Sequence, residues 1–336
     1  MSNPNEHEAV MTLQRRTLLS LAAAACATPL PAPLRAQTNF PNRPITLLVP
    51  FGPGGIADLT ARAVAEGMAK ALGQAVVVDN RPSAGSIVAS LAVATARPDG
   101  HTLLLMSNGH AVSAGLIRKL PYDTLKAFAP ITTLGFFDLG IFVAAGSRFA
   151  TLGDAVALAK ANPGQLNVGC IAVGSTQHLA VKLFETVAGV DVLAVPYKAS
   201  PAVLTALLSK EIDLAFEIVG PMLPHVSGGT VKALAVTSGL RNPALPDVPT
   251  VAQAGIAGYD VASWNALAAP AGTPAAVIER LGAAAREALA APATRDKMAR
   301  LGMRLQGSTP AQLQALLTAE VQRWAAVIRA AKIEAE

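Results

Sequence analysis

A glycine-rich loop between an apolar run and a helical pattern is the first stretch of this sequence that could bind a ligand. Residues 45–49 are typical of a strand covered on both faces, and apolar residues recur at helical spacing from Leu59 onward. Because glycines have no side chains, a ligand can reach the main chain between them, where the unpaired N–H groups of the helix attract anions. The loop residues predicted to contact this anion are Phe51, Gly52, Gly54, Gly55 and Ile56.

A second glycine-containing loop repeats this arrangement. Residues 166–168 are expected to form a strand, and residues 169–178 to form a loop that enters a helix. Serine and threonine are good N-cap residues, so one of two adjacent hydroxyls is expected to close the helix while the other faces the ligand. The predicted contacts here are Gly174, Ser175, Thr176 and His178.

Further polar residues follow predicted strands or begin predicted helices. Two of them carry carboxylates whose roles stay open. Asp58 lies in a first helical turn, where capping explains it as well as contact with a ligand amine does. Glu217 would repel a dianion, so we expect it to select a ligand with a cationic or hydrogen-bond-donating group. The full set of these candidates is Asp58, Ser86, Ser107, Asn108, Tyr197 and Glu217.

Catalytic and metal-binding alternatives are weaker. Cys170 and His178 could form a thiolate–imidazole pair, but the apolar neighbours of Cys170 favour a buried, inert thiol. His101, His110 and His225 are isolated, without the spacing that gathers metal ligands. We therefore predict no catalytic residue, no metal site and no cofactor.

A dinucleotide site is the main competitor. Residues 52–57 fit the pattern G-x-G-x-x-A, and Asp79 ends the next predicted strand, where a ribose-binding acid is expected. However, Phe51 and Pro53 place a bulky ring and a rigid residue in a turn that must be tight for a pyrophosphate. An exported NAD(P)-dependent oxidoreductase stays the alternative to a binding protein.

The elements that position these loops alternate between strand and helix, which predicts parallel-type sheets flanked by helices. In such a sheet the carboxyl ends of the strands meet at one edge, so the loops that follow them face one crevice. Residues 131–134 and 141–143 look like strands that leave one lobe for another. The other predicted strands are 45–49, 75–79, 101–106, 192–197, 213–216 and 231–236; the predicted helices include 154–161, 202–208, 275–290, 293–301 and 311–331.

The first 36 residues are typical of an export signal. Arg15 and Arg16 precede a short apolar core, and Ala36 offers a small residue for cleavage. The twin arginine is compatible with the export route for folded proteins. The core is far shorter than the roughly 20 residues needed to span a bilayer, so we expect no stable membrane insertion.

The charge balance is mildly basic. The chain of 336 residues carries 27 basic and 22 acidic residues, and removal of residues 1–36 would take three arginines and two glutamates and leave a charge near +4. Because the positive charges form no blocks, we expect no nucleic-acid partner and only weak steering of small anions. Cys170 would be the one remaining cysteine, which precludes an intramolecular disulfide.

Seven motifs occur in an order that resembles a known family. They are Pro50-Phe51-Gly52-Pro53-Gly54-Gly55 with Asp58, Asn80-Arg81-Pro82 with Gly85, Arg97-Pro98-Asp99-Gly100, Leu120-Pro121-Tyr122-Asp123, Val195-Pro196-Tyr197-Lys198, Leu245-Pro246-Asp247-Val248-Pro249-Thr250 and Ala269-Pro270-Ala271-Gly272-Thr273-Pro274. This series is similar to the Bug/TctC family, the periplasmic solute-binding proteins of tripartite tricarboxylate transporters. The resemblance covers nearly all of the chain after the export signal.

The resemblance implies an α/β, type II-like Venus-flytrap fold whose two lobes close on a small carboxylate. It implies binding mostly through backbone amides, hydroxyls and water, and transfer of the ligand to the membrane components of a transporter; docking on a sensor is a further alternative. We expect a periplasmic monomer with lobe 1 in residues 37–137 and 238–274, lobe 2 in residues 138–237, and C-terminal helices 275–336 packing across the lobes. Glu217 stands where this family commonly has aspartate.

Overall fold

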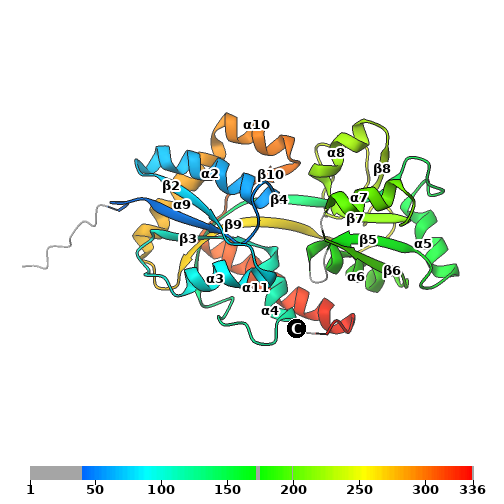
Figure 1. Cartoon of the computed structure of the whole chain (residues 1–336), viewed down its shortest axis with the longest axis horizontal. Coiled ribbons are helices and arrows are strands. Elements are labelled where there is room, and N and C mark those ends of the chain that lie inside the picture. Colours follow the sequence, from blue (N-terminus) through cyan, green and yellow to red (C-terminus); the bar gives the residue numbers. More distant parts are fainter. Residues whose placement is uncertain (1–39, 172–174, 199, 335–336) are drawn as a thin grey trace, which may run out of the picture. The chain divides into compact units, whose positions relative to one another are not determined.

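The structure is a computed structural model that describes residues 40–171, 175–198 and 200–334. The predicted export signal and Gly174 lie outside these residues. β1 (Ile45–Val49) pairs in parallel with β2 (Val76–Asn80) on one side and with β3 (Thr102–Ser107) on the other. α2 (Ile56–Leu72) and α3 (Ile87–Ala94) make the connections (Figure 1). The carboxyl ends of these three strands therefore lie at the same edge of the sheet.

A second group of parallel strands repeats this pattern. β5 (Asn167–Ile171) pairs with β6 (Leu193–Tyr197) on one side and with β7 (Leu214–Ile218) on the other. α6 (Thr176–Ala188) follows β5, and α7 (Ser200–Leu208) follows β6. The beginnings of these two helices thus follow strands that end at one edge.

One long strand connects the two groups. β4 (Phe128–Ala144) pairs with β9 (Ala262–Pro270) over residues 128–138, and β9 in turn pairs antiparallel with β3. From Leu139 onward β4 pairs with β7 and with β8 (Val231–Val236). Figure 1 shows β4 passing from the first group of strands toward the second. The first group of strands is therefore linked to β4 through β9, and the second group pairs with β4 directly.

Helices cover these strands. The remaining elements are η1 (Ala84–Ser86), α4 (Asn108–Leu116), α5 (Leu152–Ala161), α8 (Val219–Ser227), α9 (Ala275–Ala290), α10 (Pro292–Arg300), β10 (Met303–Leu305) and α11 (Pro310–Ala330). α2 and α9 touch where Gly67 faces Ala288, and a Cβ at Gly67 would lie 2.4 Å from that of Ala288. α11 packs against α4, β4 and α6. Each helix among the described residues is too short or too polar to cross a membrane.

The predicted alternation of strands and helices is confirmed, with two differences. Residues 131–134 and 141–143 belong to the single strand β4 rather than to two strands. Four elements were not predicted: the strand β9, the helices α4 and α8, and the short strand β10. Asn108 and Gly109 favour turns over helices, which hid the start of α4, and β10 has only three residues.

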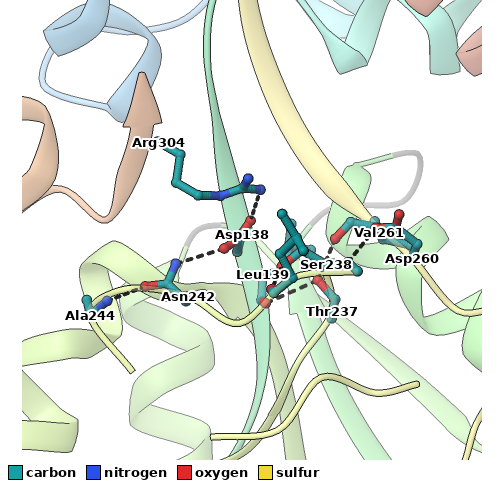
Figure 2. Close-up of polar contacts among 11 residues, drawn as sticks. Asp138, Leu139, Thr237, Ser238, Asn242, Ala244, Asp260, Val261 and Arg304 are labelled. Carbon is teal, nitrogen blue, oxygen red and sulfur yellow. Dashed lines mark hydrogen bonds and ion pairs between the residues drawn. The ribbon is translucent and has the colours of Figure 1, made fainter. Parts of the chain in front are cut away.

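A buried carboxylate lies where β4 changes partners. Asp138 is 0% exposed, and Figure 2 shows Arg304 and Asn242 directed at its two oxygens. Arg304 Nη2 donates to Oδ1 at 2.9 Å, and Asn242 Nδ2 donates to Oδ2 at 2.8 Å. The Ala244 N–H donates to Asn242 Oδ1 at 2.9 Å and fixes the amide orientation. The strand crossing is thus held by a charged group with a partner on each oxygen.

The next residue of β4 is tied to the segment between β8 and β9. The Thr237 N–H and hydroxyl both donate to the Leu139 carbonyl, at 2.9 and 3.1 Å. The same hydroxyl is 2.7 Å from the Val261 carbonyl, and the Val261 N–H donates to the Thr237 carbonyl at 2.7 Å. These contacts join the three segments that run between the two groups of strands (Figure 2).

We expect Arg304→Ala to lower the free energy of unfolding by about 3 kcal/mol, because it leaves the buried Asp138 carboxylate without its cation. Urea denaturation measures this loss. Arg43→Ala is the matched control: the Arg43–Asp99 pair is 51% and 38% exposed, so its loss should cost less than about 1 kcal/mol. Equal effects of the two substitutions would contradict the role of Asp138 at the crossing.

Candidate functional site

The loop between β1 and α2 is organised by the Asp58 carboxylate. This side chain is buried, and its Oδ2 accepts the Gly54 N–H at 2.8 Å and Arg62 Nε at 3.0 Å. Its Oδ1 accepts Asn80 Nδ2 at 2.9 Å. Burial raises the pKa of Asp58, but the hydrogen bonds from Arg62, Gly54 and Asn80 together hold it below its ordinary value. The carboxylate is therefore ionised at neutral pH and serves as the anchor of the loop.

Asn80 extends this network to the start of the loop. Its Nδ2 also donates to the Phe51 carbonyl at 3.0 Å, and its Oδ1 accepts Arg62 Nη2 at 3.0 Å. Sequence analysis left open whether Asp58 caps its helix or contacts a ligand, and it missed Asn80 and Arg62. The available signals were the spacing of Asp58 and Arg62, four residues apart on a helix, and the place of Asn80 in the Asn80-Arg81-Pro82 motif.

The loop leaves its main chain accessible. Gly52, Gly54 and Gly55 are exposed, and Phe51 is 36% exposed. Gly54 has a φ of 84°, in the left-handed region that favours glycine. Gly55 is the N-cap of α2, which therefore has no side-chain cap, and Ile56 is the first residue of the helix. The first N–H groups of α2 have no intrahelical partner and no side-chain cap. They lie beside this accessible loop.

Ser86, the last residue of η1, is the N-cap of α3, and Ser107, the last residue of β3, is the N-cap of α4. Ser86 is buried with a φ of 62°, and its carbonyl accepts the Ser90 hydroxyl at 2.7 Å. The Ser107 N–H donates to His110 Nδ1 at 3.0 Å, and the Ser90 hydroxyl lies 3.0 Å from His110 Nε2. Burial lowers the pKa of His110 to about 4, so this imidazole is neutral. Together with Ser107 it caps the N-terminus of α4.

Asn108 and Thr176 contact each other and join α4 to α6. Asn108 Nδ2 donates to Thr176 Oγ1 at 3.0 Å. Asn108 Oδ1 accepts the indole N–H of Trp324 at 2.9 Å, and the same N–H lies 2.8 Å from Glu320 Oε2. These four side chains connect α11 with the starts of the helices that follow β3 and β5. Sequence analysis did not identify Trp324 or Glu320.

Ser175, at the end of the second loop, is the N-cap of α6. Its hydroxyl accepts the His178 N–H at 3.1 Å and donates to the Ile171 carbonyl at 2.9 Å. Burial, followed by Lys182, lowers the pKa of His178. Burial, followed by Glu217, raises the pKa of the Cys170 thiol to about 12. This thiol is therefore protonated at neutral pH and unsuited to nucleophilic attack.

Tyr197 ends β6, and Glu217 is the last residue but one of β7, on the other side of β5. The Tyr197 hydroxyl donates to Glu211 Oε1 at 2.9 Å, so its hydrogen-bond donor is already engaged. Glu217 is completely buried in β7, and its Oε2 accepts the Ser200 hydroxyl at 2.8 Å and the Ile218 N–H at 3.0 Å.

The structure thus brings the candidate residues into three groups. One is Gly54 with Asp58; the second is Asn108 with Thr176; the third is Ser175 with the backbone of His178. Ser86 bonds within its own segment, to Ser90, whereas the Tyr197 hydroxyl donates to Glu211 beyond α7. Among the described residues, no cluster of three or more histidine, cysteine, aspartate or glutamate side chains could hold a metal ion.

Comparison with known proteins identifies the family. The sequence profile of the tripartite tricarboxylate transporter family receptor, TctC, matches residues 60–333. The chain belongs to the TctC family. This is a family of periplasmic binding proteins, so the chain is a solute-binding protein and not an enzyme. The alternative of an exported oxidoreductase, based on the G-x-G-x-x-A pattern, is therefore wrong.

Individual TctC relatives cover nearly the whole chain. A UPF0065 protein encoded in the tcbD–tcbE intergenic region of Pseudomonas sp. strain P51 is 38% identical over 94% of each chain. MatC from Rhodopseudomonas palustris, solved with bound malate, is 32% identical with a TM-score of 0.74 and covers 86% of this chain and 100% of its own. R. palustris Rpa4515, solved with adipate, is 32% identical with a TM-score of 0.77, covering 88% and 99%. The α/β periplasmic binding protein fold is thereby confirmed.

Asp58→Ala is expected to loosen the first loop of this TctC protein, because the Gly54 N–H, Asn80 and Arg62 lose a common acceptor. Hydrogen exchange at the Gly54 amide should accelerate at least about tenfold, and the free energy of unfolding should fall by about 2–3 kcal/mol. Glu66→Ala on the same helix removes an exposed ion pair with Lys70 and should cost only about 0.5 kcal/mol. Unchanged exchange at Gly54 in the Asp58 variant would rule out the anchoring role.

Proposed function

We propose that this protein captures a small dicarboxylate between two lobes and delivers it to the membrane components of a tripartite tricarboxylate-type transporter. The observation that carries the proposal is the loop of residues 51–55. Its exposed glycines lead to the uncapped start of α2, and Asp58 holds them in one conformation. A rigid loop with accessible main-chain donors binds a carboxylate without prior ordering, which reduces the entropic cost of binding.

The two groups of strands provide the lobes in this proposal. Lobe 1 comprises residues 37–137 and 238–274, lobe 2 comprises residues 138–237, and the helices of residues 275–336 pack across them. The Asn108–Thr176 hydrogen bond supports this arrangement, because it joins the helix that follows β3 to the helix that follows β5. Closure requires contacts that form only in the closed state, so both loops should contribute to affinity.

Two observations support a dicarboxylate as the ligand. Malate and adipate, the ligands in the two R. palustris structures, each have two carboxyl groups. The small positive charge of this chain weakly attracts anions. The ligand contacts in the proposal are the residues named from the sequence: Phe51, Gly52, Gly54, Gly55, Ile56, Asp58, Ser86, Ser107, Asn108, Gly174, Ser175, Thr176, His178, Tyr197 and Glu217.

The cellular setting follows from the family and the predicted signal. We propose export to the periplasm, by the twin-arginine route, with cleavage near Ala36 and function as a monomer. Arg15 and Arg16 support the route, and Ala36 supplies the small residue for cleavage.

A thermal-shift screen of the mature protein tests the ligand class. The panel comprises mono-, di- and tricarboxylates, acidic amino acids, aromatic acids, NAD and NADP. A ligand present at one hundred times its dissociation constant adds about 2.7 kcal/mol to the free energy of unfolding, which raises Tm by several degrees. We expect a rise with one or more dicarboxylates. A rise with a nucleotide and none with any carboxylate would refute the proposal.

Gly54→Val is expected to abolish that shift in a protein that still folds. A β-branched residue at a φ of 84° costs about 1–2 kcal/mol, and its side chain covers the accessible main chain. Gly73→Val is the matched control, because Gly73 ends the same helix with a φ of 67° and nothing within 4 Å of its Cβ position. The control should lose similar stability and keep its ligand. Normal affinity in Gly54→Val would remove this loop from the site.

A further inference from the structure

A line of hydrogen bonds runs from α11 to the start of α6. Trp324 and Asn108 are 0% exposed, and the indole N–H of Trp324 donates to Asn108 Oδ1 at 2.9 Å. Asn108 Nδ2 in turn donates to Thr176 Oγ1 at 3.0 Å. α11 packs against both α4, which begins at Asn108, and α6, which begins at Thr176. The Asn108 side chain therefore links two helix starts to the C-terminal helix.

The indole decides the orientation of the Asn108 amide. An indole nitrogen only donates hydrogen bonds, whereas an amide has an acceptor on one side and a donor on the other. Turning the amide by half a rotation would put the Asn108 nitrogen in the place of its oxygen, 2.9 Å from the Trp324 nitrogen, with donor against donor. The oxygen of Asn108 therefore faces Trp324, and its nitrogen faces Thr176.

Glu320 holds the indole in this position. Its Oε2 accepts the same Trp324 N–H at 2.8 Å, and its Oε1 accepts Arg323 Nη1 at 3.2 Å. The guanidinium of Arg323 also lies 5.1 Å from the centre of the Trp324 ring. The indole N–H thus points between two acceptors, one on its own helix and one on α4.

The hydroxyl of Thr176 is consequently an acceptor toward Asn108. A hydroxyl has one proton and two acceptor lone pairs, and the proton rotates to suit its partners. Because the Asn108 N–H occupies one lone pair, the proton of Thr176 points away from Asn108. Among residues 40–171, 175–198 and 200–334, none accepts a hydrogen bond from this hydroxyl. Its donor is therefore available to a further partner.

Thr176 lies between the two groups of strands. It is half-buried and is the first residue of α6, directly after the N-cap Ser175. α4 follows β3 and α6 follows β5, so the bond from Asn108 to Thr176 joins the carboxyl ends of both groups. The start of a helix attracts negative charge. The partner that suits the Thr176 hydroxyl at this place is an anionic acceptor.

We infer that Asn108 and Trp324 are positioning residues of the carboxylate site: they fix the Thr176 hydroxyl as a hydrogen-bond donor toward the ligand. The ligand group bound at the start of α6 is then an acceptor, a carboxylate rather than an ammonium. This inference rests on the proposed function, and it adds α11, which contains neither ligand-binding loop, to the elements that set affinity.

The first test compares dissociation constants measured by calorimetry, with malate and adipate as the probes. Thr176→Val keeps the shape of the side chain and removes the hydroxyl. It should weaken binding by about tenfold or more, because one hydrogen bond to a charged group is missing. Thr176→Ser keeps the hydroxyl and should restore most of the affinity.

Asn108→Asp should reverse the direction of the hydrogen bond. A carboxylate has no donor, so it accepts the Trp324 N–H and the Thr176 hydroxyl, and Thr176 then presents only lone pairs to the ligand. The loss of affinity should exceed that of Thr176→Val, since repulsion between two anions adds to it. Adding Thr176→Val to this variant should weaken binding no further, because the hydroxyl no longer serves the ligand.

A double-mutant cycle tests the role of Trp324. Trp324→Phe keeps an aromatic ring but lets the Asn108 amide turn toward Glu320, so affinity should fall several-fold. Combined with Thr176→Val it should cost much less than the product of the two single losses, whereas an unrelated change in packing would multiply with the loss at Thr176. Trp264→Phe is the matched control and should keep its affinity, because Trp264 is equally buried and its indole N–H has no partner among the described residues.

Nitrogen-15 NMR of the ligand-free protein checks the network itself. The chain has two tryptophans and hence two indole N–H signals, of which Trp324→Phe identifies one. The Trp324 signal should move in Asn108→Asp, which places a charged acceptor beside it. It should stay near its wild-type position in Thr176→Val, which shows that the variant keeps its fold.

Three results would overturn the inference while leaving the proposed function intact. They are wild-type affinity in Thr176→Val, independent effects of Thr176→Val and Trp324→Phe, and a Trp324 signal that is the same in wild type and Asn108→Asp. If no carboxylate binds the wild-type protein, the proposed function itself is refuted, and the positioning role is refuted with it.

Discussion

The arrangement of both groups of strands depends on the strand β4. It stops pairing with β9 and begins to pair with β7 from one residue to the next. Asp138 still pairs with Ala262 of β9, whereas Leu139 already pairs with Ile218 of β7. Removing a carboxylate from water at this point is costly, and the cost is offset only when its partners have good geometry. The guanidinium of Arg304 and the amide of Asn242 meet this condition from separate segments. A shift of either segment would leave a buried charge unpaired, so this contact favours one arrangement of the strands.

The two ligand-binding loops of the proposed site use different means to prepare a helix start for an anion. α2 has a glycine at its N-cap, and the order of its loop comes from a carboxylate inside the first turn, with Asn80 and Arg62 as further partners. α6 is closed by Ser175 in the ordinary way. In the proposed site, the helix start without a side-chain cap is therefore that of α2, whereas Ser175 occupies one donor of α6.

Much of the fold was accessible from the sequence because its signals are local. Short apolar runs such as residues 45–49, followed by glycine and then by helical periodicity, predicted the parallel strands, their helices and the first loop. Two strands, residues 131–134 and 141–143, were predicted where the structure has the single strand β4. Gly135 lies inside β4 between these two stretches, and a Cβ there would be 2.5 Å from the Arg304 carbonyl of β10. The reason for the glycine is thus a contact with a segment far along the chain.

The contacts that organise the site could not be inferred in this way. Asp58 and Asn80 are 22 residues apart, and Asn108 and Trp324 are 216 residues apart. No local pattern of residue types encodes such pairs. The residue types did identify Asp58, Asn108 and Thr176 as polar groups near the strand ends. What the structure adds is that these side chains bond to other parts of the protein.

Asp58 and Glu217 show why the charge of a buried carboxyl group cannot be assigned from its position alone. Asp58 lies in the first turn of α2 and Glu217 near the end of β7, and both accept a backbone N–H. Asp58 also has the guanidinium of Arg62, so its pKa lies below the ordinary value despite burial. Glu217 has a hydroxyl and an amide but no cation, so burial prevails and its pKa is raised. The same chemical group therefore has its pKa shifted in opposite directions at the two positions. The partner that makes the difference is Arg62, which lies 3.0 Å from Asp58 Oδ1 and offsets its negative charge beside the start of α2.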